Sequence, residues 1–234
     1  MRPSLHAFTR LELLACVAAA ALVAGIALPA LAGSRAEGDR AACANNLRLF
    51  GRAVNIWGAD HGELPPWLTY VSNGGNRPDG GGGRFTSAWQ EYTALSNELA
   101  TPRILACPAD DGVKAAVEFS AVANRGYMAT GMRALATSYW LNTDNLFSTP
   151  QMALVGDRNV RTLGSTQCGY GYLSVDYRSV NGGDPVFWTN AVHGVQGHVA
   201  QTDGSVAFTT SAALLNNWGA LLDDNGSFHH LRAR

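Results

Sequence analysis

The sequence lacks several features that would place it in common functional classes. Only 15% of its 234 residues are charged and the formal net charge is -1, so nothing predicts electrostatic attraction to nucleic acid. Its four cysteines form no Cys-x-x-Cys pair, so neither a zinc ribbon nor a thioredoxin-type redox site is indicated. No serine lies in a nucleophile-elbow pattern, which leaves hydrolase chemistry unsupported. We therefore do not expect an enzyme.

Charge is absent altogether from one long stretch near the N-terminus. The apolar run Leu13–Ala32 has 20 residues, about 30 Å of α-helix, which is long enough to span a bilayer. Arg2 and Arg10 precede the run, and Arg35 and Arg40 follow it. Because the two flanks carry equal numbers of these cations, the positive-inside rule does not orient the segment.

A single carboxylate, Glu12, lies at the start of this run and four residues after Phe8, which follows the small residue Ala7. A carboxylate within hydrocarbon costs roughly 2.5–3.5 kcal/mol on insertion scales, so it is normally kept for a partner. The arrangement resembles the type IV prepilin signature. The resemblance implies that a prepilin peptidase cuts after Ala7, that Phe8 becomes the methylated N-terminus, and that Glu12 pairs with a neighbouring subunit's terminal amine. Pro29, expected to kink the helix, is also placed as in type IV pilins.

An ordinary signal peptide is the alternative interpretation of the same segment. Ala30-Leu31-Ala32 followed by Gly33 has the small-x-small form of a signal peptidase site. The apolar run is longer than the roughly 7–15 residues of a typical signal-peptide core, and Glu12 would serve no purpose in it. In both interpretations the chain after Ala32 lies outside the cytoplasm.

Beyond the apolar run, the sequence has the period of an amphipathic helix. Five apolar residues follow one another at intervals of four and three: Cys43, Leu47, Phe50, Val54 and Trp57. This pattern predicts one helix from about Phe8 to Ala59, ended by Gly62 and Pro65-Pro66. The expected organisation is a leader at 1–7, a transmembrane half at 8–32, an amphipathic half at 33–62 and a globular head at 63–234.

A second resemblance links this helix to the C-terminal part of the head. The elements are Cys43-Ala44-Asn45-Asn46-Leu47, Leu64-Pro65-Pro66, Cys107-Pro108-Ala109-Asp110, and His193 placed nine residues before Asp203-Gly204. Together they resemble a large subfamily of pilin-like proteins that carry an H-x9-DG element. The resemblance implies a disulfide between Cys43 and Cys107 and supplies no enzymatic role for His193.

The head is expected to be α+β and pilin-like, with the long helix packed on an antiparallel sheet. Residues 72–84 form a glycine-rich loop, and 113–123 are expected to form a short helix. Strands are expected between about 135 and 210, at Thr137–Leu141, Met152–Asp157, Gly169–Val175, Val186–Val192 and in a hairpin around Asp203-Gly204. A type I′ turn there would place Val199 opposite Phe208, and Ser211–Leu222 would be helical.

Two places in the sequence carry residues of the types that bind metals. His193, His198 and Asp203 are typical ligand types, but a spacing of five puts the two histidines on opposite faces of a continuous strand. Only a folded-back turn through Gly194 and Gly197 would bring them together, so we expect hairpin stabilisation and no metal. Residues 223–226, Asp-Asp-Asn-Gly, faintly resemble a calcium loop but lack a distal glutamate.

The sequence therefore predicts a pilin-like or pseudopilin-like subunit of a type II secretion or type IV pilus filament. Its partners would be the prepilin peptidase, other subunits and the bacterial inner membrane, with the head in the periplasm or in a surface filament. The alternatives are an exported binding module with a signal peptide cleaved after Ala32, and a periplasmic metalloenzyme using His193 and His198.

Overall fold

The computed structural model describes residues 9–80, 88–133, 135–143, 151–162, 186–218 and 230–231. The chain divides into two compact units, Met1–Asp39 and Arg40–Arg234. The expected leader and cleavage site at Ala7 and Phe8 lie outside the described residues, as does the expected strand Gly169–Val175.

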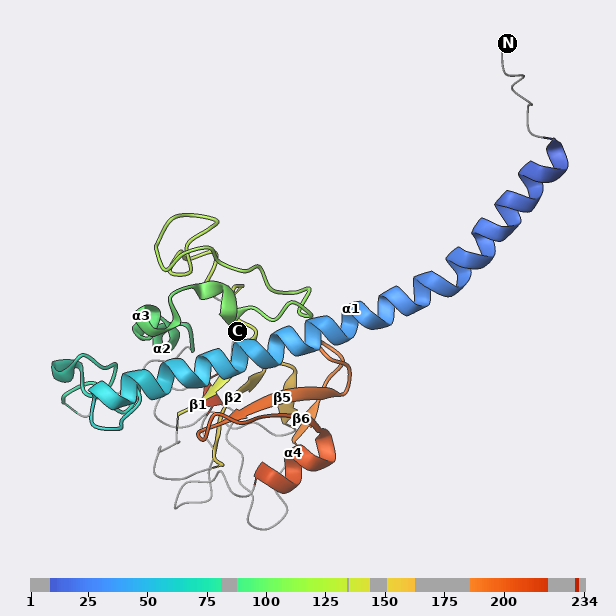
Figure 1. Ribbon diagram of the computed structural model, residues 1–234. Coiled ribbons are helices and arrows are strands. Elements are labelled where there is room, and N and C mark those ends of the chain that lie inside the picture. Colours follow the sequence, from blue (N-terminus) through green and yellow to red (C-terminus); the bar gives the residue numbers. More distant parts are fainter. Residues whose placement is uncertain are drawn as a thin grey trace. The chain divides into compact units, whose positions relative to one another are not determined.

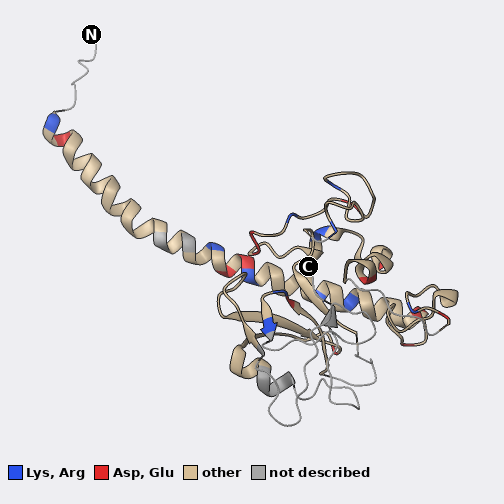
Figure 2. Ribbon diagram, turned by 180° about the vertical axis from the view of Figure 1, so that it is seen from behind, with Lys and Arg blue, Asp and Glu red and all other residues tan. Residues whose placement is uncertain are grey.

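One helix, α1 (Arg10–Asp60), dominates the N-terminal part of the chain. In the first unit its large apolar side chains are exposed, and no charged residue interrupts it from Leu13 to Ser34, a stretch that shows no blue or red in Figure 2. By length and composition this helix could cross a membrane. The helix continues through Pro29, so the proline does not end it, and the kink expected there stays a prediction. It ends where Gly62 and Glu63 adopt positive φ, a conformation that stops a helix.

The part of α1 from Arg40 onwards belongs to the second unit and is amphipathic as predicted. All five residues of the expected apolar stripe are buried: Cys43, Leu47, Phe50, Val54 and Trp57. Phe50 meets the ring of Tyr92 edge-on, with 5.0 Å between the ring centroids. This face of the helix therefore forms one side of the main core.

The other side of that core is an antiparallel sheet in the order β6-β5-β2-β1-β7 (Figure 1). Its strands are β1 (Tyr139–Asn142), β2 (Ala153–Asp157), β5 (Gln196–Gln201), β6 (Val206–Thr210) and β7 (His230–Leu231). The helix lies close to the sheet at Gly51, where an added Cβ would be 3.9 Å from Leu154 Cδ2 of β2. A long helix packed on an antiparallel sheet confirms the expected α+β class.

Shorter elements surround this core. They are η1 (Val71–Asn73), α2 (Ala88–Ala94), α3 (Ser96–Leu99), η2 (Pro102–Leu105), α4 (Ser211–Trp218), and a separate two-stranded sheet of β3 (Val160–Thr162) and β4 (Val186–Trp188). Trp188 of β4 is buried in a second apolar cluster together with Trp140 of β1 and Leu214 of α4. The expected strand Val186–Val192 is shorter than predicted, because the chain turns after β4.

The β5–β6 hairpin has a different register from the one predicted. Phe208 lies opposite His198, and Val199 lies opposite Ala207. A type I′ turn needs positive φ at both central residues, but of Asp203 and Gly204 only Gly204, at φ 83°, has it. The loop instead contains three residues, closed by the Gln201 N–H donating to Ser205 O. The extra loop residue moves the pairing by one position and places Phe208 beside His198.

Two further expectations were wrong in part. Residues 113–123 form no helix, because their backbone groups bond to distant partners, Val117 N–H to Arg125 O and Lys114 N–H to Leu135 O. Residues 72–84 were expected to form a glycine-rich loop throughout, yet the described portion of this segment begins within η1. Gly75 then passes so close to Thr69 that a Cβ would lie 2.1 Å from Thr69 O.

Candidate functional site

A disulfide joins α1 to the loop that follows η2. Cys43 and Cys107 are both buried, with Cα atoms 4.9 Å apart, and this is the pair that the family resemblance implied. Asn46, one turn further along α1, donates its side-chain N–H to Ala106 O at 3.1 Å. The loop is therefore held on α1 by a covalent bond and an adjacent hydrogen bond.

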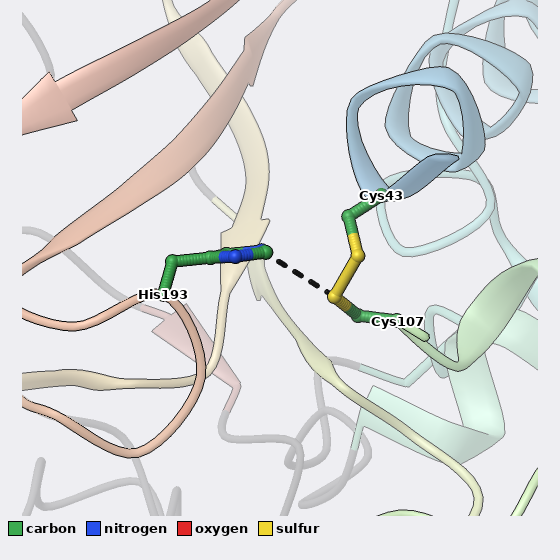
Figure 3. Close-up of side chains that lie close together, drawn as sticks. All are labelled: Cys43, Cys107 and His193. Atoms are coloured by element: carbon green, nitrogen blue, oxygen red, sulfur yellow. Dashed lines mark hydrogen bonds between the residues drawn. A yellow bond between two sulfur atoms is a disulfide. The ribbon is translucent and has the colours of Figure 1, made fainter. Parts of the chain in front are cut away.

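His193 lies against this disulfide. Figure 3 shows its imidazole reaching from the loop before β5 towards the sulfur of Cys107, and the Nε2–Sγ distance is 3.4 Å. The same Nε2 lies 3.5 Å from Oδ2 of Asp157. The first residue of the H-x9-DG element thus contacts both the disulfide and the last residue of β2.

Asp157 and His198 form the second half of the cluster. Oδ2 of Asp157 accepts a hydrogen bond from the His198 backbone N–H at 2.6 Å and lies 2.9 Å from His198 Nδ1. The two imidazole centroids are 4.8 Å apart and nearly perpendicular. Asp157 is fully buried, and within the described part of the chain its other oxygen, Oδ1, has no hydrogen-bond partner. We call Asp157, His193 and His198 the His–Asp cluster.

A tight turn between β4 and β5 explains how two histidines five residues apart meet. Gly194 adopts φ 67°. Asn159 donates its side-chain N–H groups to Thr189 O, Gly194 O and Gln196 O, which closes the turn on itself. His193 therefore lies beside His198. On a continuous strand, as expected from the sequence, a spacing of five would have put the two side chains on opposite faces.

A salt bridge borders the cluster. Arg158 donates from Nε and Nη2 to the two carboxylate oxygens of Asp110, a bidentate pair in which the Asp110 side chain is fully buried. Ser138 donates its hydroxyl to Asp110 and accepts the Cys107 N–H, each at 2.9 Å. Asp110 is thus neutralised by an arginine, while Asp157 has only His193 and His198 as ion-pair partners in the part of the chain that the structure describes.

Burial is the largest influence on the charge of His193 and lowers its pKa below the ordinary value of 6.5. Asp157 and Asp110 raise this pKa, whereas His198 and Arg40 lower it further, and the balance leaves it depressed. At neutral pH the imidazole of His193 is therefore uncharged. A neutral imidazole has one nitrogen that carries no proton.

The second half of the H-x9-DG element lies apart from the His–Asp cluster. Asp203 is exposed and accepts the Ser205 N–H at 2.8 Å, and hydrogen bonding to the side chain and then the backbone of Ser205 lowers its pKa. Gly204 lies over α1, since an added Cβ on Gly51 would be 4.0 Å from Gly204 Cα. The element therefore reaches α1 at both ends, through the disulfide at His193 and through backbone contact at Gly204. Of the three residues considered as ligands, the structure brings His193 and His198 together, and the carboxylate beside them is that of Asp157, not Asp203.

At the other end of α1, Glu12 makes local contacts. Its Oε2 accepts hydrogen bonds from the backbone N–H of Thr9 at 2.8 Å and from the Thr9 hydroxyl at 2.9 Å. In return, the Glu12 N–H donates to the Thr9 hydroxyl at 3.3 Å. This reciprocal pattern is a capping box, and the Thr-x-x-Glu spacing could have indicated it from the sequence. The calcium-like residues 223–226 lie outside the described residues.

Sequence reasoning missed Asp157 and Arg158. Both follow from the position where β2 ends, and no motif in the sequence marks them. Chemically, the cluster offers two imidazole nitrogens and a carboxylate, whose donor atoms lie within 4.8 Å of one another. No model of a known protein family matches this chain, and neither a curated protein nor a solved structure matches it.

Proposed function

We propose that this protein is a pilin-like or pseudopilin-like subunit, processed at Ala7–Phe8 and assembled through α1 into a type II secretion or type IV pilus-like filament. The observation that carries the proposal is the two-part character of α1. Its first part has exposed apolar side chains and no charge from Leu13 to Ser34, and its second part is built into the core of an α+β head. Such a helix can be stored in a bilayer and then packed among copies of itself while the head stays folded.

The disulfide supports a filament role because it ties the head to α1. Assembly and extraction of the apolar helix pull on the head through α1, and Cys43 ties that helix covalently to the Cys107 loop. Gly204 and His193 hold the same face from the sheet side. The head thus has several attachments to the helix that would carry load within a filament.

Glu12 has two candidate roles, and its charge separates them. As a capping residue it needs only an oxygen that accepts the Thr9 N–H, and glutamine serves equally well at this position of a capping box. As the partner of a neighbouring subunit's terminal amine it needs a negative charge, because an unpaired ammonium in hydrocarbon is costly. Glu12→Gln therefore keeps the cap and removes the charge, and Thr9→Ala weakens the cap and keeps the charge.

The test compares these two variants with the original chain in cells that carry the matching assembly machinery. We expect all three to mature to an N-methylated Phe8 in mass spectrometry of the N-terminal peptide. Filament incorporation, measured in the sheared or cross-linked fraction, should be lost in Glu12→Gln and retained in Thr9→Ala. Normal incorporation of Glu12→Gln would contradict the pairing role. A mature N-terminus at Gly33 would contradict the whole proposal and leave the exported-module alternative.

A further inference from the structure

We propose that Asp157, His193 and His198 bind a divalent transition-metal ion of the Zn²⁺ class. The inference concerns the head alone and does not depend on filament assembly. The three side chains come from the end of β2, from the turn before β5 and from β5 itself. All three are buried, so an ion held there would be enclosed by protein.

The charge balance of the His–Asp cluster favours a bound cation. A buried carboxylate is costly unless a positive partner accompanies it. The neighbouring carboxylate of Asp110 pairs with Arg158, but among the described residues Asp157 has only the two imidazoles as ion-pair partners. A bound divalent cation would supply such a positive partner for Asp157. Oδ1 of Asp157 is buried and has no hydrogen-bond partner among the described residues, so this carboxylate has capacity left for an additional ligand.

The distances between the potential ligand atoms are close to those of a zinc site. Tetrahedral ligands at zinc distances of 2.0–2.2 Å lie about 3.3–3.5 Å from one another. Oδ2 of Asp157 is 2.9 Å from His198 Nδ1 and 3.5 Å from His193 Nε2, which brackets this separation. The ion would lie between Oδ2 and the two imidazole nitrogens, in place of direct contacts between these atoms. The backbone N–H of His198, bonded to Oδ2, fixes the orientation of the carboxylate from behind.

The donor types select the class of metal. Two imidazole nitrogens and one carboxylate oxygen suit Zn²⁺ and similar borderline ions, whereas Ca²⁺ and Mg²⁺ require mainly oxygen ligands. A second group of potential ligands, Cys43, Cys107 and His193, overlaps with this one. Its two sulfurs are joined in the disulfide and are therefore not thiolates.

The experiment uses the full chain without an affinity tag, purified in detergent with its disulfide intact and stripped with a chelator. After dialysis against a small excess of Zn²⁺, bound metal is counted by mass spectrometry and thermal unfolding is followed by tryptophan fluorescence. We expect one equivalent of zinc and a higher midpoint of unfolding with Zn²⁺, and neither effect with Ca²⁺. Absence of bound zinc would overturn the proposal.

Variants locate the ion. His193→Gln and Asp157→Asn should each lower the bound zinc at least tenfold, while His61→Gln, whose ring stacks on Trp57 outside the cluster, should keep it. His229→Gln/His230→Gln tests the histidine pair near the C-terminus and should also keep the zinc. Zinc that survives in His193→Gln, or that disappears in His229→Gln/His230→Gln, would overturn the assignment.

A spectroscopic measurement on the unaltered chain covers the case in which a cluster variant does not fold. Co²⁺ in place of Zn²⁺ should give the intense visible bands of a tetrahedral site without sulfur-to-metal charge transfer. Charge-transfer bands would show that the disulfide had opened and that the cysteines were the ligands, which would overturn the proposal. Only the weak bands of octahedral, solvated Co²⁺ would overturn it as well.

Discussion

Removal of the Cys43–Cys107 disulfide is expected to be among the most damaging small changes to the head. The perturbation is made in two ways, by reduction of the original chain and by the double variant Cys43→Ala/Cys107→Ala. Reduction leaves the composition of the core unchanged, while the double variant also removes two buried sulfur atoms. Agreement between the two therefore isolates the effect of the cross-link from that of packing.

The magnitude follows from the length of chain that the disulfide closes. The cysteines are 64 residues apart, and in the chain-entropy account a loop of that length stabilises the folded state by about 4 kcal/mol at 25 °C. Because typical domains are stable by only about 5–15 kcal/mol, this loss would remove a large fraction of the total. The contact of His193 with Cys107 would persist, since a thiol remains there after reduction.

The assay is urea unfolding of the full chain in detergent, followed by tryptophan fluorescence. All six tryptophans lie after Arg40 and so report only on the second unit. Cys16→Ala is the matched control, because Cys16 is a free, exposed cysteine in the first unit and should leave the transition unchanged. A loss below about 1 kcal/mol on reduction would refute the loop-closure reasoning. Equal losses in Cys16→Ala and in the double variant would show that the assay does not report on the cross-link.

Two further outcomes are expected in the same assay. Arg158→Met leaves the buried carboxylate of Asp110 without its partner and should lower the free energy of unfolding by about 3 kcal/mol or more. Arg125→Met breaks an exposed pair with Glu118 and should lower it by less than about 1 kcal/mol. Equal losses in the two variants would contradict the role of burial. With chelator present, the pKa of His193 is lower in the folded chain than in the unfolded chain, so the unfolded chain takes up a proton first as the pH falls. The contribution of His193 to the free energy of unfolding should therefore be complete above pH 6.5 and be lost as the pH falls below it. His193→Gln should flatten this part of the pH profile, and an unchanged slope in that variant would show that another group is responsible.

Local pattern was a reliable guide wherever neighbours along the chain decide the structure. The 4-3-4-3 spacing that runs from Cys43 to Trp57 predicted which face of α1 is buried, because a helix repeats every 3.6 residues irrespective of its surroundings. Local pattern was a poor guide at 113–123, where long-range backbone hydrogen bonds replace helical ones. The hairpin lies between these cases. Asp203-Gly204 marked its turn correctly, but the number of loop residues depended on φ at Asp203 and on the hydrogen bond from Thr202 N–H to the carbonyl of Met152, the residue before β2.

The sequence by itself determined the long helix, its uncharged and amphipathic parts, and the approximate position of most strands. These properties depend on residue type and period within a short segment. Only the tertiary structure decided that His193, His198 and Asp157 meet beside the disulfide, since these residues come from three elements whose approach depends on sheet order and on the turn closed by Asn159. No period or spacing in a linear chain records which strand end will face which loop, because that is settled by packing of the whole core.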